Sequence, residues 1–391
     1  VPLATVEAGH GFDDLAPIAR MVAGARLVAL GEATHGTREF SQLKHRLLEY
    51  LVTRLGFSVF LMEAGVGDAS ALDDYIVNGK GDARSALGAA VYRIWDTEEL
   101  LAMVEWMRAW NADPAHTKLR FYGVDVQSPS TGLPILLAYL DRVDPTQAAR
   151  ARGYLAPVRE YLGRRDYGKL SAATRAALHD GLRDLLARFD AQRTGWTKAT
   201  SAREWLVARK AADVIRQRTS SFAPPAGETE VDARDKGMAE NAAWVLEDLE
   251  PGARGVLWAH DMHIARDGYD GVISVGQRLA ARYGKSYVAL GFAWNQGGFR
   301  ALEYGGPEVH EVGADAPGGF GATFASLGLP LAAIDLRGAR GAVRAWFAAP
   351  HRTREIGALF TTEEHMDAVV RLSGSFDAVL FIDRTTPARR L

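Results

Sequence analysis

The sequence predicts a layered α/β/α fold with a mainly parallel sheet and a large all-helical insertion. Short aliphatic and β-branched runs alternate with segments of helical periodicity, which is the pattern of a layered α/β core. Several of these runs are apolar at every position, as expected for strands that are buried on both faces of a parallel sheet. The strands are expected at 26–30, 58–62, 119–124, 255–259, 287–292, 331–335 and 378–382.

Helices are expected between these strands. Phe40 and Leu43 begin a series of apolar residues at helical spacing, and a second series follows Thr97. Asp96 and Glu99 have the spacing of a capping pair, so this second helix is expected to begin at about Thr97.

The region from about 132 to 241 has a different character. It contains no strand-like run and is rich in alanine, leucine and arginine, which are good helix formers. We therefore divide the chain into an α/β catalytic core, formed by 1–131 and 242–391, and a helical insertion at 132–241 that is expected to cover the active-site cleft. The glycine-rich segment 297–319 is expected to form a long loop or a hairpin near a strand end.

The composition is that of an ordinary globular protein and excludes several classes of function. The 391 residues are 48% hydrophobic and 24% charged, and the formal net charge of -2 gives no reason to expect nucleic acid or an anionic membrane as a partner. No run reaches the roughly 20 apolar residues that a membrane-spanning helix needs. The absence of cysteine excludes disulfides, thiolate metal sites and a cysteine nucleophile. The expected location is cytoplasmic, or secreted if a leader was removed before Val1, and the oligomeric state is not determined by the sequence.

Four polar clusters stand where an expected strand ends. They contain Glu32 with His35, Glu63, Asp125, and His260 with His263. The carboxyl ends of parallel strands share one edge of the sheet, and ligands bind in the crevice there. We therefore expect these side chains to converge on one site, although Asp125 taken alone is better explained as a helix cap or a salt-bridge partner.

These residue types suit hydrolysis by activated water. A histidine can accept a proton from water near neutral pH, and a nearby carboxylate fixes its tautomer and stabilises the imidazolium that forms. A second histidine, or an arginine such as Arg234, could stabilise the oxyanion that develops on an attacked carbonyl. The parts therefore indicate hydrolysis of an ester or a lactone.

Other nucleophiles and cofactors lack their motifs. No Gly-x-Ser-x-Gly elbow is present, and neither is a P-loop or a Gly-x-Gly-x-x-Gly segment after a strand. Ser41 and Lys44 match a Ser-x-x-Lys pattern, but they lie in an expected helix without the accompanying motifs, so the match is attributed to chance.

Two alternatives stay open at this stage. A metal-dependent hydrolase could use Glu32, His35, Glu63, His260 and His263 as nitrogen and oxygen ligands of zinc, although no His-Glu-x-x-His motif occurs. The chain could also be a noncatalytic protein that binds haem or another small molecule, with one of the later histidines as an axial ligand. The acids beside the histidines favour catalysis, because haem binding does not need them.

The segment 31–40, with the sequence Gly-Glu-Ala-Thr-His-Gly-Thr-Arg-Glu-Phe, resembles the leading motif of the erythromycin esterase family. Further similarity follows in the same order along most of the chain. The matching positions are 43–47, 56–57, 63–64, Trp95, Thr97, Glu98, Trp106, Arg108, Asn111, 123–127, 234–235, Met238, Ala239, Asn241, 260–263, Gly276, 283–284 and Tyr287.

The resemblance implies metal-independent hydrolysis of the macrolactone ester of macrolide antibiotics, with resistance by ring opening as the result. It implies a small-molecule substrate and no cofactor. By motif match, His35 would be the general base. The other implied catalytic residues are Glu63, His260 and His263, and the implied support or substrate-binding residues are Glu32, Lys44, Asp125 and Arg234.

Two positions depart from the family pattern. Asp261 stands where the family commonly has asparagine, and an extra negative charge there could change the pKa of either neighbouring histidine or favour a cation. The segment 65–67 is small and glycine-containing where the family often carries bulky aromatic residues. That segment is expected to touch the substrate, so the reaction class carries over from the family more directly than the substrate does.

Overall fold

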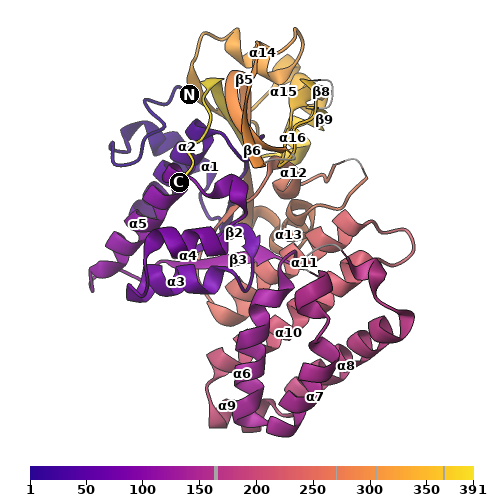
Figure 1. Ribbon diagram of the computed structural model, residues 1–391. Coiled ribbons are helices and arrows are strands. Elements are labelled where there is room, and N and C mark those ends of the chain that lie inside the picture. The colour runs from indigo at the N-terminus through magenta and orange to yellow at the C-terminus, as the bar shows by residue number, and fades with distance from the viewer. Residues whose placement is uncertain (163–165, 270, 304–305, 364–365) are drawn as a thin grey trace. The chain divides into compact units, whose positions relative to one another are not determined.

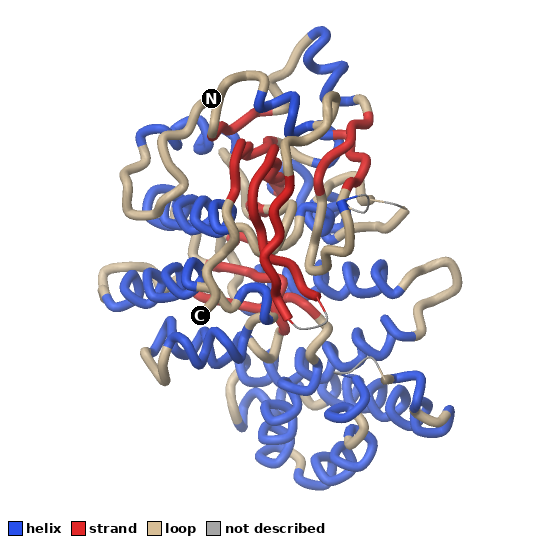
Figure 2. The backbone as a smooth tube through the Cα atoms, turned by 45° about the horizontal axis from the view of Figure 1, so that its top comes forward, coloured by secondary structure: helices blue, strands red, loops and turns tan. Residues whose placement is uncertain are grey.

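The computed structural model describes residues 1–391 except 163–165, 270, 304–305 and 364–365 (Figure 1). The strands of the main sheet are β1 (Leu27–Leu30), β2 (Val59–Gly65), β3 (Arg120–Asp125), β4 (Gly255–Trp258), β5 (Tyr287–Glu303), β6 (Gly306–Val312), β7 (Leu331–Asp335) and β10 (Ala378–Thr385). Among the described residues their order is β3-β2-β4-β1-β5-β10-β7, and β6 pairs with β5 (Figure 2). Strands β2, β4, β1, β5 and β10 run parallel, whereas β6 and β7 are antiparallel to their neighbours. The protein therefore has the mixed α/β fold with a mostly parallel central sheet that the sequence predicts.

The helices lie between the strands in the order expected of such a fold. They are α1 (Ala16–Met21), α2 (Arg38–Leu55), α3 (Ala69–Asn78), α4 (Ala83–Ala90), α5 (Glu98–Ala112), α6 (Leu133–Val143), α7 (Pro145–Leu155), α8 (Ala172–Ala191), α9 (Arg193–Ala199), α10 (Ala202–Phe222), α11 (Glu230–Trp244), α12 (Asp261–Ile264), α13 (Val275–Tyr283), α14 (Phe320–Ala325), α15 (Gly341–Ala348) and α16 (Leu372–Ser375). Helix α2 buries the predicted apolar residues Phe40 and Leu43 completely. Its burial anchors the segment that follows β1 against the core.

Two local details differ from the sequence-based expectations, and the hairpin that was one of two expectations for 297–319 is confirmed. The cap of α5 is Thr97, whose side chain accepts a hydrogen bond from the backbone N–H of Leu100 at 3.3 Å, so the pairing of Asp96 with Glu99 was wrong. The segment 297–319 contains the second half of β5 and all of β6, which form an antiparallel hairpin; its positions 304–305 lie outside the described residues. A separate two-stranded hairpin of β8 (Pro350–Arg354) and β9 (Asp367–Arg371) was not expected.

The chain divides into two compact units. The first contains Val1–Glu63, Ala71–Phe121 and Ala253–Leu391, and the second contains Ala64–Ser70 and Tyr122–Gly252. The part of 132–241 that the structure describes is helical and carries no strand, in line with its composition. The division into a core at 1–131 with 242–391 and an insertion over the cleft stays a prediction.

The second unit has an apolar core of its own. Helix α10 packs against α6, α8 and α11, and buried side chains from these helices, such as Leu136, Leu182, Phe189 and Ile215, form one cluster. Such a cluster stabilises helices that would be marginal alone, because most helical stability comes from burial of an apolar face.

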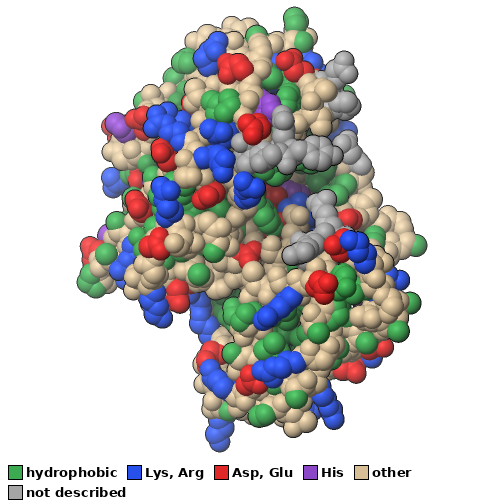
Figure 3. Space-filling model, viewed as in Figure 1, with side chains coloured by type: hydrophobic (Ala, Val, Ile, Leu, Met, Phe, Trp, Pro, Cys, Tyr) green, Lys and Arg blue, Asp and Glu red, His purple; other side chains and the backbone are tan. Residues whose placement is uncertain are grey.

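Within the described residues, none of the helices is both long and apolar enough to span a bilayer. On the face shown in Figure 3, basic and acidic side chains are interspersed. This agrees with the near-zero net charge of the chain.

Candidate active site

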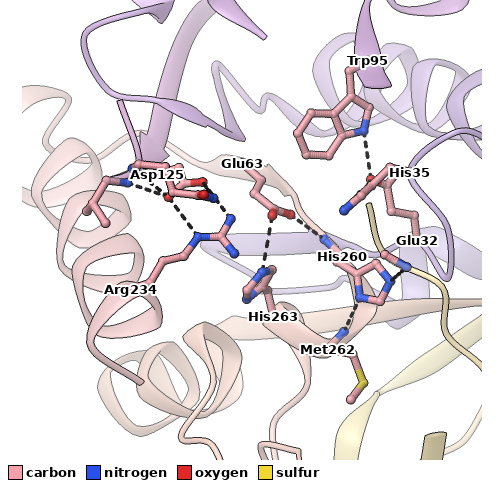
Figure 4. A network of polar contacts seen from close by, with 12 residues as sticks. Glu32, His35, Glu63, Trp95, Asp125, Arg234, His260, Met262 and His263 are labelled. Atoms are coloured by element: carbon pink, nitrogen blue, oxygen red, sulfur yellow. Dashed lines mark hydrogen bonds and ion pairs between the residues drawn. The ribbon is translucent and has the colours of Figure 1, made fainter. Parts of the chain in front are cut away.

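The register of the sheet brings three of the predicted clusters together. Leu30 is paired with Trp258, and Met62 is paired with the same tryptophan from the other side. Leu30, Met62 and Trp258 therefore lie at the same level of the sheet. Glu63 is the next residue of β2, which continues to Gly65, whereas Glu32 and His260 lie two residues beyond β1 and β4; the three side chains meet although they are far apart in the sequence (Figure 4).

Glu32 is the centre of this arrangement and is 1% exposed. Its Oε1 accepts hydrogen bonds from Nδ1 of His35 at 2.7 Å and from Nε1 of Trp95 at 3.0 Å. Its Oε2 accepts from Nε1 of Trp258 at 2.9 Å and from Nζ of Lys44. Four donors on one carboxylate satisfy its acceptor capacity, which is the condition for holding a negative charge in the interior.

Lys44 supplies the counter-charge to Glu32 from within α2. Its ammonium is fully buried and also lies 3.8 Å from the centre of the Trp258 ring, in a cation–π arrangement. Burial lowers the pKa of Lys44 from 10.5 to about 8, although Glu32 opposes the change. Lys44 is therefore the ion-pair partner of the Glu32 carboxylate, and it loses its proton at a lower pH than an exposed lysine does.

His35 is fixed by Glu32 in one tautomer. Glu32 can only accept hydrogen bonds as a carboxylate, so Nδ1 of His35 carries a proton and Nε2 keeps its lone pair. The ring lies edge-on to Trp95, with 4.6 Å between centroids, and to His260, with 5.2 Å. Among the described residues, none is hydrogen-bonded to Nε2. The ring is thus oriented with a basic nitrogen available, which is the arrangement that a general base requires.

Glu63 connects the two later histidines. Its Oε2 accepts a hydrogen bond from the backbone N–H of His260 at 3.0 Å, and its Oε1 lies 3.4 Å from Nε2 of His263. All three side chains are buried. His263 lies on α12 one turn after His260, because His260 is the N-cap of this short helix. The expected proximity of Glu63, His260 and His263 is confirmed as geometry.

Backbone N–H groups face both ring nitrogens of His260. The backbone N–H of Met262 lies 3.2 Å from Nδ1 and that of Gly357 lies 3.1 Å from Nε2, and an uncharged imidazole accepts a hydrogen bond at only one of these nitrogens. Burial lowers the pKa of His260 well below its ordinary value, and the neighbouring His35 lowers it further. His260 is therefore an uncharged ring that is held in place on two sides.

Asp261, the first of the two family departures, does not bring a negative charge to the surface of the site. Both of its carboxyl oxygens face the backbone N–H of Phe292, at 3.1 and 3.0 Å, and burial raises its pKa well above the ordinary value. A protonated carboxyl group has the shape and the neutral charge of an asparagine amide. The close approach of this carboxyl group requires glycine at position 31, where a Cβ would lie 1.6 Å from Oδ1 of Asp261.

Asp125 and Arg234 form a pair of their own within the second unit. Two nitrogens of Arg234 donate to the two oxygens of Asp125, at 3.1 and 2.7 Å. Asp125 also accepts from the backbone N–H of Val126 and Gln127, so it combines a salt bridge with a turn-capping role, as its residue type alone suggested. The guanidinium charge of Arg234 is balanced by this carboxylate.

The sequence analysis missed one acidic residue of the site and the purpose of two tryptophans. Glu355 lies 3.7 Å from Nε2 of His260, and no sequence motif marks this glutamate. Trp95 and Trp258 occur in recognised segments, but their indole N–H groups were not expected to bind Glu32. Trp258 ends β4 just before the strand-end motif 260–263 and was a signal that could have been used, since a buried indole needs an acceptor.

The donor set was also tested for a metal centre. Within the described ranges, with their gaps at 163–165, 270, 304–305 and 364–365, no group of three or more histidines and acids has the arrangement needed to hold an ion. The oxygens of Glu32 are directed at nitrogen donors, and both nitrogens of His260 face backbone N–H groups. Glu32 and His260, two of the five ligands proposed for zinc, thus have other partners.

A parallel α/β sheet with a buried carboxylate–histidine pair at its carboxyl edge defines a class of protein built for acid–base chemistry on a small molecule. The chain belongs to the erythromycin esterase family, whose sequence model matches residues 52–385. The match begins after the segment 31–40, so it does not include Glu32, His35 or Lys44. Family membership makes the protein a hydrolase of the esterase type.

Individual relatives agree with this assignment. The chain is 25% identical to erythromycin esterase type II of Escherichia coli over 336 residues, which cover 79% of this chain and 78% of that protein. A solved structure named as a succinoglycan biosynthesis protein is 27% identical, with a TM-score of 0.88 and coverage of 99% of this chain and 95% of the other. An erythromycin esterase mutant in its open conformation has a TM-score of 0.74 at 18% identity, covering 96% and 94% of the two chains, and it shares the fold.

Proposed function

We propose that this protein opens a macrolactone or a related ester with a water molecule that His35 activates, without a metal or another cofactor. The observation that carries the proposal is the Glu32–His35 pair, in which a buried carboxylate with four donors leaves Nε2 of His35 as the basic atom. A positioned base of this kind contributes roughly a 10²- to 10⁴-fold acceleration.

In the proposed hydrolysis, one proton moves from water to Nε2 of His35 and then to the leaving alkoxide. Water gives a proton to Nε2 of His35 while its oxygen bonds to the acyl carbon of the ester. The resulting oxyanion is stabilised by His263 as an imidazolium, which directs its Nε2–H at Glu63 across the 3.4 Å contact and donates its Nδ1–H to the oxyanion. The acyl C–O bond breaks, and the leaving alkoxide takes the proton from His35. The products are one carboxylic acid and one alcohol, which remain in the same molecule if the substrate is a lactone.

The remaining residues act as support in this proposal. Lys44 holds the Glu32 carboxylate in place, and His260 limits the movement of the His35 ring. Asp125 and Arg234 are proposed as support within the second unit. Because Asp125 balances the charge of Arg234, we assign the oxyanion to His263 and not to this arginine.

The test is turnover of a substrate panel by the His35→Gln variant, followed by mass spectrometry. The panel contains macrolides, simpler lactones and acylated saccharides, the last because one structural relative is named for succinoglycan biosynthesis. The wild-type protein is expected to add one water to its substrate, and the variant to lose about 10²-fold or more in kcat/KM. The matched control is His10→Gln, since His10 is an exposed surface residue. Full activity of the His35 variant would show that another group is the base.

Three further measurements address the other functions and the role in resistance. Metal analysis and chelator treatment of active protein test the metal-dependent alternative, in which chelation would abolish turnover. A Soret band on haem addition, without turnover of any panel member, would support the binding-protein alternative. Macrolide susceptibility of a sensitive bacterial strain expressing the protein, compared with the His35→Gln variant, tests resistance.

A further inference from the structure

Glu355 lies beside the site on a segment that the motif search did not reach. It directly follows β8, and the next residues join the end of β1: Ile356 donates to the carbonyl of Ala33 at 2.8 Å, and Gly357 bridges to Thr34. The backbone N–H of Gly357 then bonds to Nε2 of His260. This segment is therefore a third wall of the site, contributed by the C-terminal part of the chain.

The carboxyl group of Glu355 is enclosed. Its side chain is 4% exposed, and its Oε2 has no hydrogen-bond donor among the described residues. An ionised carboxylate in such a position is unfavourable, because burial removes water and no hydrogen-bond donor of the described residues replaces it at Oε2. Burial accordingly raises the pKa of Glu355 well above its ordinary value, and the nearby Asp261 raises it further.

The two glutamate–histidine pairs of the site thus have opposite character. Glu32 receives four donors and serves His35 as an anion. Glu355 has its Oε2 at 3.7 Å from Nε2 of His260, which is a packing contact rather than a hydrogen bond, and His260 is uncharged. When two carboxyl groups of one site lie in environments that favour opposite charge states, they commonly have different chemical roles.

We propose that Glu355 is a positioning residue which acts as an uncharged carboxylic acid and keeps the ring of His260 neutral and fixed against His35. An anion at this position would favour the imidazolium form of His260. A cationic ring 5.2 Å from His35 would then oppose the uptake of a proton by the proposed base. The consequence for turnover rests on the proposed function, whereas the uncharged state of Glu355 does not.

The decisive comparison is Glu355→Gln with Glu355→Ala. Glutamine reproduces an uncharged carboxylic acid in size and charge, so Glu355→Gln should keep kcat/KM within about twofold of the wild type. Alanine removes the contact with His260, and a loosened ring should lower kcat by about 10- to 100-fold with little change in KM. Glu308→Gln is the matched control, because Glu308 is exposed on β6. Equal, large losses in both Glu355 variants would overturn the proposal, since they would show that the charge is needed.

Two readouts need no substrate and therefore separate this proposal from the esterase assignment. A glutamate whose pKa is raised on folding stabilises the protein below its ordinary pKa, and this contribution is lost as the pH rises towards the folded-state value. The difference in Tm between Glu355→Gln and the wild type should therefore increase in favour of the variant as the pH rises above the ordinary glutamate pKa of 4.5. The groups that face Glu355 are His260 and Asp261, so the comparison is repeated in an Asp261→Asn background.

The second readout is the ¹⁵N NMR signal of the His260 ring, assigned with His260→Gln. The wild type and Glu355→Gln should both show a neutral ring in one tautomer, and Glu355→Ala should show averaging of the two nitrogen signals. A protonated His260 in the wild type at neutral pH, or a Tm difference that does not change with pH, would overturn the uncharged state of Glu355 even if no ester substrate were found.

Discussion

Replacing Glu32 by glutamine removes the charge on which the buried site is built. Glutamine has one oxygen where glutamate has two, so two of the four donors would face an amide NH₂ group instead of an acceptor. Lys44 would be left as a fully buried ammonium without its counter-charge. Breaking a buried ion pair by removing one partner costs about 3–5 kcal/mol.

We therefore expect Glu32→Gln to lower the free energy of unfolding by about 3–5 kcal/mol. The lost hydrogen bonds, at about 1.5–3 kcal/mol each, are contained in this figure because they involve the same groups. Lys44 can reduce the cost by releasing its proton, since its pKa is already lowered to about 8. Glu32 raises the pKa of Lys44, so in the variant this pKa lies lower still, and the destabilisation should become smaller as the pH rises towards 8.

The assay is urea denaturation of the wild type and the variant at two pH values, on either side of 8. Glu98→Gln serves as the control, because Glu98 is 55% exposed and its ion pair with Arg389 has a separation of 3.7 Å. The same denaturation curve for the control and the wild type is expected. A loss of less than about 1 kcal/mol for Glu32→Gln would refute the view that this carboxylate compensates a buried charge.

Three other substitutions test separate parts of the structure. Asp261→Asn should fold and keep turnover. Because the pKa of Asp261 is raised on folding, the stability of the variant relative to the wild type should increase as the pH rises, and thermal denaturation across a pH series measures this. Gly31→Ala should destabilise the protein strongly or prevent folding, since the alanine Cβ would overlap Asp261. Circular dichroism and the Tm measure this, and a Tm equal to that of the wild type would contradict the packing described. Arg234→Met should lower the free energy of unfolding by about 3–5 kcal/mol by leaving the fully buried Asp125 without its partner, and wild-type stability in a denaturant titration would speak against this pairing.

Much of the fold could be predicted from local sequence patterns. All seven expected strands are present, because a strand buried on both faces must be apolar at every position. Their ends differ by a few residues except in β5, which was expected to end at 292 and runs to Glu303. The exception is the hairpin of β8 and β9, whose sequences mix charged and apolar residues. Such short, half-exposed strands depend on tertiary contacts for their existence, so their pattern carried no clear signal.

The candidate site was predictable in part. The clusters after β1, β2 and β4 were recognised because polar residues immediately after an apolar strand are unusual, and parallel strands bring such residues to one edge. The pairing of Asp125 with Arg234 also agrees with the prediction that a single acid after a strand is a helix cap or a salt-bridge partner. The expected effect of Asp261 was different: its negative charge was anticipated from the residue type, whereas burial favours the neutral acid.

The sequence by itself determined the order of strands and helices, the family, and the presence of acids and histidines at strand ends, because each is written in adjacent residues. Only the tertiary structure decided which donors meet Glu32: Trp95 is 63 positions away and Trp258 is 226 positions away along the chain. It also decided that Glu355 reaches His260. The physical reason is that hydrogen bonds over such separations depend on strand order, register and burial, and these are properties of the packed chain rather than of any segment in it.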